Sequence, residues 1–175
     1  DIIKSQEIKD LATAIGSLPG DEDVSNLRYG KICILADADS DGLHIATLLC
    51  ALFLRHYKNL VTSGKIFVSM PPLYRIDAAK EVFYALDENE KESIVKKIKK
   101  QNSKIKIDIQ RFKGLGEMNP SQLRETVMKP DSRRLVQLTL SSSDNANSVF
   151  DLLLSKKRAP DRKEWLEKKG NLVEI

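Results

Sequence analysis

The sequence predicts an α/β fold in its first half, and three consecutive segments indicate it. Residues 31–36, Lys-Ile-Cys-Ile-Leu-Ala, form a short apolar run that is typical of a buried strand. Residues 43–60 carry apolar side chains on most faces, which predicts a helix buried against a sheet. Residues 66–68, Ile-Phe-Val, follow as a second strand. A strand, a crossover helix and a second strand form a βαβ unit, whose two strands are parallel.

The rest of the chain predicts a less regular mixture of helices and strands. Before the parallel pair, residues 3–15 have helical spacing that Gly16 ends, and after it Pro71-Pro72 ends the βαβ unit. The further predicted elements are a hairpin of 73–76 and 81–86, a helix through Lys100 opened by a capping box of Asp87 and Glu90, a strand at 105–109, a helix from Asn119-Pro120 to Met128, a strand at 134–140, a helix capped by Asp144 and a last helix with Trp165 in the core. We expect a boundary near Ile76, between an α/β region and a smaller mixed α+β region.

Composition indicates a globular protein with an anionic partner. The chain has 175 residues, 41% of them hydrophobic and 31% charged, and its net charge is +4. The basic residues gather at 96–106, 111–113, 133–134 and 156–169, a distribution that suits a polyanion. Cys33 and Cys50 lie in apolar segments, so we expect small buried hydrophobes rather than a disulfide. Without a signal peptide or a membrane-spanning stretch, the prediction is a cytoplasmic protein that has no membrane partner.

Three aspartates on alternate positions are the main functional signal. Asp37, Asp39 and Asp41 directly follow the first strand and are closed by Gly42. In an extended segment these carboxylates project from one side and repel each other unless a cation lies between them. Hard oxygen ligands favour Mg²⁺, and the carboxyl end of a strand is where open α/β sheets place their ligands. The sequence therefore predicts a magnesium site formed by the three aspartates.

The aspartate loop also fits other kinds of site. A calcium-binding EF-hand begins with the same spacing, but it needs a glutamate at its twelfth position, where this chain has Leu48. Asp41 could instead cap a helix that begins at Leu43, because aspartate is a favoured N-cap. A phosphatase of the haloacid dehalogenase type also places Asp-x-Asp after a strand. That alternative stays open at the level of this motif.

Two long segments together resemble a known family. Residues 31–45 are similar to the metal-binding segment of the TOPRIM domain in bacterial type IIA DNA topoisomerases, and residues 110–118, Gln-Arg-Phe-Lys-Gly-Leu-Gly-Glu-Met, resemble that family's second signature. Pro71-Pro72-Leu73-Tyr74 lies between them, as in the family. The resemblance implies a TOPRIM domain at 1–76, with a Rossmann-like parallel sheet flanked by helices. It also implies that 77–175 form the smaller mixed α+β C-terminal region of the family's B subunit.

The resemblance also implies a function for the longer protein. In this family the B subunit holds Mg²⁺ near the scissile phosphate and works with an A subunit in a heterotetramer. The complex performs ATP-dependent double-strand DNA cleavage, passage and decatenation at the bacterial nucleoid. The family's catalytic glutamate, in a Glu-Gly-Asp-Ser segment that would precede Asp1, is not among these residues. ATP binds only the full-length parent, and the A subunit carries the nucleophilic tyrosine. We therefore expect no complete catalytic set in this chain, and no activity from it alone.

Three basic or titratable residues are candidates for DNA contacts. His44 follows the aspartate loop, where an imidazole next to a phosphate is plausible, although a lone histidine is more often a surface residue. Lys113 lies in a Lys-Gly-Leu-Gly turn, whose glycines let the backbone approach a phosphate or only shape a tight turn. Arg162 begins the last basic helix. The sequence predicts phosphate contacts from these three side chains.

Overall fold

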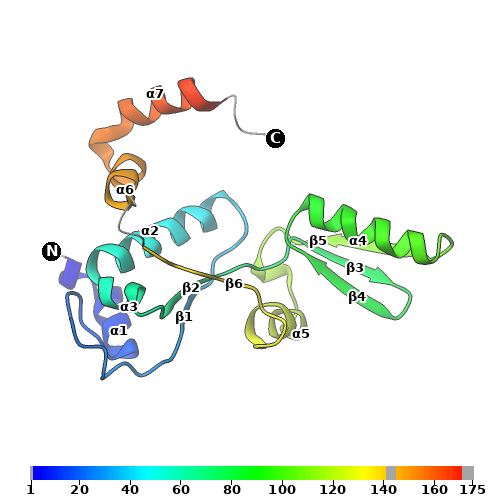
Figure 1. The fold of residues 1–175 in the computed structure, drawn as a ribbon, viewed down its shortest axis with the longest axis horizontal. Helices are drawn as coiled ribbons and strands as arrows, with labels where there is room; N and C mark the ends of the chain where they lie inside the picture. The colour runs from blue at the N-terminus through cyan, green and yellow to red at the C-terminus, as the bar shows by residue number, and fades with distance from the viewer. Residues whose placement is uncertain (1, 141–144, 171–175) are drawn as a thin grey trace. The chain divides into compact units, whose positions relative to one another are not determined.

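The computed structural model describes residues 2–140 and 145–170, and the chain divides into two compact units (Figure 1). Unit 1 comprises Asp1–Arg28, Cys50–Gly64 and Thr139–Ile175, and unit 2 comprises Tyr29–Leu49 and Lys65–Leu138. The boundary expected near Ile76 does not coincide with this division and stays a prediction about family domains.

Unit 1 is helical. Helix α1 (Gln6–Ile15) ends at Gly16, whose φ of 77° is in the left-handed region that glycine adopts readily, as the sequence predicts. The end of α2 (Ser40–His56) and the short α3 (Lys58–Thr62) bury Phe53 and Tyr57, whose ring centroids lie 5.5 Å apart. Helices α6 (Ala146–Leu154) and α7 (Ala159–Lys169) complete the described part of this unit. The cap predicted at Asp144 lies outside the described residues.

The first sheet of unit 2 contains the predicted parallel pair. Its strand order is β1 (Ile32–Ile34), β2 (Ile66–Ser69) and β6 (Leu135–Gln137). Strand β1 pairs with β2 in parallel, and β6 pairs with β2 in antiparallel orientation. The α/β class and the parallel βαβ pair are confirmed. The wider Rossmann-like sheet that the resemblance implies stays a prediction, because the described sheet has one parallel pair and one antiparallel strand.

The second sheet of unit 2 follows from the predicted hairpin. Strands β3 (Tyr74–Ala78) and β4 (Glu81–Ala85) are joined by a two-residue turn, and β5 (Ile107–Arg111) pairs with the other edge of β3. Helix α4 (Glu88–Gln101) lies along this sheet in Figure 1 and packs Ile98 against the fully buried Ile76. The Asp87 side chain caps α4 by accepting from the Glu90 N–H, as predicted.

The segment after the second signature begins as a capped helix. Asn119 and Gln122 form a reciprocal capping box around Pro120, which confirms the predicted start of α5 (Pro120–Leu123). The chain then continues as a π-helical turn at Arg124–Met128, which ends where the sequence predicts the helix to end. Single π-helical turns are uncommon and often lie next to functional sites.

Several burial predictions are wrong. Cys33 is exposed, because β1 lies at an edge of its sheet and has β2 as its one described neighbour. Leu43 and Leu48 of α2 are 64% and 45% exposed, so the described elements leave part of this apolar helix uncovered. Trp165 is 43% exposed and is not a core residue. Apolar patterning predicted these elements, but it could not predict how many partners cover them.

Candidate functional site

The aspartate loop joins β1 to α2, and the structure changes the predicted roles of two aspartates. Helix α2 begins at Ser40, so Asp41 lies in its first turn rather than in an extended segment. The Gly42 N–H donates to Asp39 Oδ1 over 2.7 Å, which makes Asp39 the helix cap. The prediction that all three carboxylates project from one extended segment is therefore wrong, and the alternative in which Asp41 caps a helix starting at Leu43 is wrong as well. The backbone turns into the helix earlier than predicted.

Asp37 is held by the second signature segment. The Leu115 N–H donates to Asp37 Oδ1 over 2.7 Å, although the two residues are 78 positions apart in the chain. Leu115 begins a short 3₁₀ turn, Leu115–Glu117, that follows Lys113 and Gly114. The two segments that carry the family resemblance therefore meet at one carboxylate. Sequence analysis missed this contact, and the one available signal was the pair of glycines in the turn.

The carboxylates partly fit a divalent cation. One oxygen of Asp37 and one of Asp39 accept backbone hydrogen bonds, and neither second oxygen has a hydrogen-bond partner among the described residues. Such carboxylate oxygens are ligands that Mg²⁺ accepts, together with water. Within residues 2–140 and 145–170, no group of three or more His, Cys, Asp or Glu side chains is arranged to hold a metal. The described residues thus offer carboxylate oxygens in this loop but no complete metal-binding group, and the predicted magnesium site stays a prediction.

The three predicted DNA-contacting residues lie in different settings. His44 is exposed in the first turns of α2, and Lys113 is exposed beside the contact between Leu115 and Asp37. Arg162, in unit 1, instead donates from Nη1 to the backbone oxygens of Leu152 and Ser155, 2.9 and 2.7 Å away. Its guanidinium thus satisfies carbonyl groups at the end of α6, a structural role. Phosphate contact by these residues stays a prediction.

Comparison with known proteins identifies the relatives of this chain. It is 59% identical over 175 residues to the B subunit of DNA topoisomerase 4 from Pseudomonas aeruginosa, and 62% identical over 178 residues to the same protein from Haemophilus influenzae. These alignments cover 100% and 99% of this chain. Over its whole length, the chain is homologous to a segment of the B subunit of DNA topoisomerase 4. The family resemblance predicted from the two motifs is confirmed.

The comparison also separates two branches of the type IIA topoisomerases. The short connection between the motifs, and the ending from Lys156 to Leu166, resemble topoisomerase IV more than gyrase, which predicts the topoisomerase IV branch. In agreement, the B subunit of DNA gyrase from Thermotoga maritima is 40% identical over 168 residues, covering 95% of this chain and 26% of that protein. Residues 104–167 also match the family described as "DNA gyrase B subunit, carboxyl terminus". The chain is therefore more similar to topoisomerase IV than to gyrase. Both similarities favour a topoisomerase over a phosphatase of the haloacid dehalogenase type.

The chain spans 28% of the length of both topoisomerase IV relatives. Among the described residues, no helix combines the length and apolar character needed to cross a membrane.

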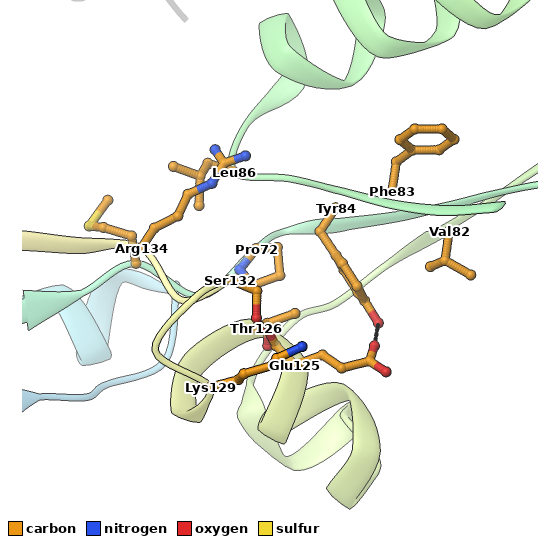
Figure 2. Close-up of a pocket in the computed structure, with 11 residues that line it drawn as sticks. Pro72, Val82, Phe83, Tyr84, Leu86, Glu125, Thr126, Lys129, Ser132 and Arg134 are labelled. Carbon is orange, nitrogen blue, oxygen red and sulfur yellow. Dashed lines mark hydrogen bonds between the residues drawn. The ribbon is translucent and has the colours of Figure 1, made fainter.

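Away from the aspartate loop, unit 2 contains a cavity with a volume of about 450 Å³ (Figure 2). Val82 and Tyr84 of β4 form one wall, and Glu125 and Lys129 from the π-helical turn and its end form another. Figure 2 shows the Tyr84 hydroxyl pointing to Glu125, and it donates to Oε2 over 3.1 Å. Burial, followed by the hydrogen bond to Glu125, raises the pKa of Tyr84. This contact ties the hairpin to the helical segment that follows the second signature.

Acid is expected to weaken unit 2 through Glu90 and Arg134. Arg134 Nη1 donates to Glu90 Oε2 over 2.8 Å, and the Leu86 N–H donates to the same oxygen over 2.7 Å. The bond from Arg134, supported by the one from Leu86, lowers the pKa of Glu90. Because the pKa of Glu90 is lower in the folded state than in the unfolded state, its ionised carboxylate stabilises the fold at neutral pH. This contribution is lost as the pH falls below the unfolded-state pKa of glutamate, about 4.3. Because the Glu90–Arg134 pair is partly exposed, we expect it to contribute less than about 1 kcal/mol to the free energy of unfolding.

This prediction is checked by urea unfolding between pH 7 and pH 3. Glu90→Gln and Arg134→Gln should each flatten the same part of the stability curve, and the double variant should add little to either. A wild-type and Glu90→Gln pair with parallel pH curves would contradict it.

Proposed function

We propose that this chain supplies magnesium and DNA-phosphate contacts in topoisomerase IV. In that role it would be part of the B subunit, and the A subunit would complete the cleavage site in a heterotetramer acting on double-stranded DNA. The supporting observation is the meeting of both signature segments at Asp37, in a chain whose whole length is similar to the topoisomerase IV relatives. The reaction would be ATP-dependent double-strand passage and decatenation, with ATP bound outside this chain. Such a protein would act at the nucleoid in the bacterial cytoplasm.

The chain's own residues would orient two carboxylates toward the cation. Asp37 is oriented by the Leu115 N–H and Asp39 by the Gly42 N–H, so both enter the site with fixed directions. Asp41, in the first turn of α2, is the third proposed ligand. When bound, Mg²⁺ would stabilise negative charge on the phosphate and on the leaving oxygen.

Contacts to DNA would be made mainly to phosphates. His44 and Lys113 are exposed and belong to the two segments that meet at Asp37, so both are candidates for phosphate contacts beside the proposed cation. A lysine ammonium attracts phosphate oxygens without reading base sequence. Arg162 remains a proposed contact through the guanidinium nitrogens that α6 does not engage. We therefore expect little sequence preference.

The proposal is tested with the full-length parent protein, mixed with the A subunit of topoisomerase IV, ATP, Mg²⁺ and catenated DNA. Asp37→Ala should reduce DNA cleavage and decatenation by about 100-fold or more, because loss of a metal ligand exceeds the effect of losing an outer hydrogen bond. The matched control is Asp108→Ala, which removes an exposed aspartate from β5 and leaves the loop intact.

ATP hydrolysis by both variants should match that of the wild type, which would show that the loss is specific to the cleavage site. Full cleavage activity in Asp37→Ala would remove the aspartate loop from the proposed function. Equal losses in Asp37→Ala and Asp108→Ala would also count against it.

A further inference from the structure

The turn at residues 113–116 has a feature that its sequence resemblance does not explain. It contains two glycines with different surroundings. A Cβ atom built on Gly114 would lie 3.1 Å from Asp37 Oδ1 and 3.2 Å from Asp37 Cγ, whereas a Cβ atom on Gly116 would meet nothing within 4 Å. Gly114 has φ −167° and ψ 173°, an extended conformation that any residue adopts. The neighbouring carboxylate, rather than the backbone conformation, therefore favours glycine at this position.

Buried residues flank the same turn on both sides, and hydrogen bonds within it fix its backbone. Phe112 and Met118, which flank the turn, are 2% and 7% exposed. Within it, the Lys113 N–H donates to Glu117 Oε2 over 2.8 Å, and the Met118 N–H donates to the Leu115 carbonyl over 3.1 Å. A turn whose two ends are buried can keep its N–H groups in place, and so orient a side chain that accepts a hydrogen bond from it.

Little space is left where Ala38 of the aspartate loop faces this turn. The cavity left among Ala38, Pro71, Phe112 and Leu115 is about 10 Å³, at the lower limit for a single water molecule. Asp37 itself is exposed, and with Ala38 and Leu43 it also lines a cavity of about 180 Å³, so the turn contacts this residue without enclosing it. On its other side, a Cβ atom on Gly42 would lie 2.1 Å from the Asp37 carbonyl oxygen, so α2 also packs directly on this residue.

We infer that the turn at 113–116 is a positioning element for Asp37: the Leu115 N–H holds Oδ1, and the missing side chain of Gly114 leaves room for the carboxylate. Held in this way, Asp37 presents Oδ2, which has no hydrogen-bond partner among the described residues. This inference deepens the proposed function, on which its metal-binding part rests. This role differs from direct phosphate contact, because the Leu115 N–H acts on Asp37 and not on DNA.

The first test needs no metal and uses amide hydrogen exchange by NMR in the 175-residue chain. The Leu115 N–H should exchange slowly in the wild type and at least about tenfold faster in Asp37→Ala, which removes the acceptor. Asp37→Asn keeps an oxygen at the same place and should restore protection. Asp39→Ala is the control and should leave Leu115 protected. Unchanged exchange of Leu115 in Asp37→Ala would overturn the inference.

The second test measures Mn²⁺ binding to the full-length parent by electron paramagnetic resonance, without DNA. Gly114→Ala should raise the Kd for Mn²⁺ about tenfold, the effect expected when a ligand loses its orienting partner. Gly116→Ala, two residues away in the same turn, should change it less than about twofold. Circular dichroism establishes that both variants fold.

The outcomes distinguish this inference from the proposed function. Equal Mn²⁺ affinities of Gly114→Ala and Gly116→Ala would overturn the positioning role. A wild-type protein that bound no Mn²⁺ would overturn the proposed metal site, and the exchange of Leu115 would still decide whether the turn holds Asp37.

Discussion

Replacing Ile76 by alanine is expected to lower the free energy of unfolding of unit 2 by about 2–5 kcal/mol. Ile76 is 0% exposed at the centre of β3, where it packs with Ile98 of α4 and with the neighbouring strands. Removing buried methyl groups loses their transfer free energy and leaves a cavity that a strand paired on both edges cannot collapse to fill. The measurement is urea denaturation followed by circular dichroism, with hydrogen exchange of β3 amides as a local readout.

The chain offers a matched control on the adjacent strand. Ile109 of β5 is the direct partner of Ile76 in the strand register, yet it is 44% exposed. Ile109→Ala removes the same atoms from the same sheet, so both variants change β propensity similarly. We expect it to cost less than half as much as Ile76→Ala. Equal losses would mean that strand propensity, rather than burial against α4, stabilises this sheet.

Gly42→Ala is expected to disturb the aspartate loop directly. A Cβ atom at this position would lie 2.1 Å from the Asp37 carbonyl oxygen and 2.7 Å from its carbonyl carbon, well inside van der Waals contact. Alanine favours a helix over glycine by about 1 kcal/mol, which would stabilise α2. Overpacking against backbone costs about 1–3 kcal/mol or more, because no flexible side chain can move aside. The clash should therefore outweigh the gain, with a net loss of stability and displacement of Asp37.

The control for this variant is Gly30→Ala, in the same unit, where a Cβ atom would meet nothing within 4 Å. It should change the unfolding free energy by less than about 0.5 kcal/mol. Urea unfolding of both variants gives the comparison. In the parent protein, Gly42→Ala should also reduce metal-dependent DNA cleavage, whereas Gly30→Ala should not. A Gly42→Ala protein that is more stable than the wild type would show that the loop relaxes without cost.

Local chemistry made much of the fold predictable. The end of α1 at Gly16, the cap of α4 at Asp87 and the capping box at Asn119 each depend on residues within a few positions of one another. The parallel pairing of β1 with β2 followed from their apolar runs and from the crossover helix between them. These interactions form in any context in which the segment folds, so their residue types predict them.

Burial and the fine geometry of the site were not predictable in the same way. Cys33 lies in an apolar run and Trp165 lies next to Leu166, yet both are exposed, because exposure depends on which other elements cover them. Asp39 rather than Asp41 caps α2, since the backbone turns into the helix earlier than the motif indicates. A shift of less than one helical turn is enough to change which carboxylate is engaged.

By itself, the sequence determined the family, the α/β class, the βαβ pair and the identity of the aspartate loop as the candidate site. Tertiary structure alone decided what Asp37 contacts. Its partner, the Leu115 N–H, is 78 residues away, and a backbone N–H carries no sequence identity that a motif could reveal. Such a contact depends on how the two segments pack in unit 2, and packing is a property of the folded chain as a whole.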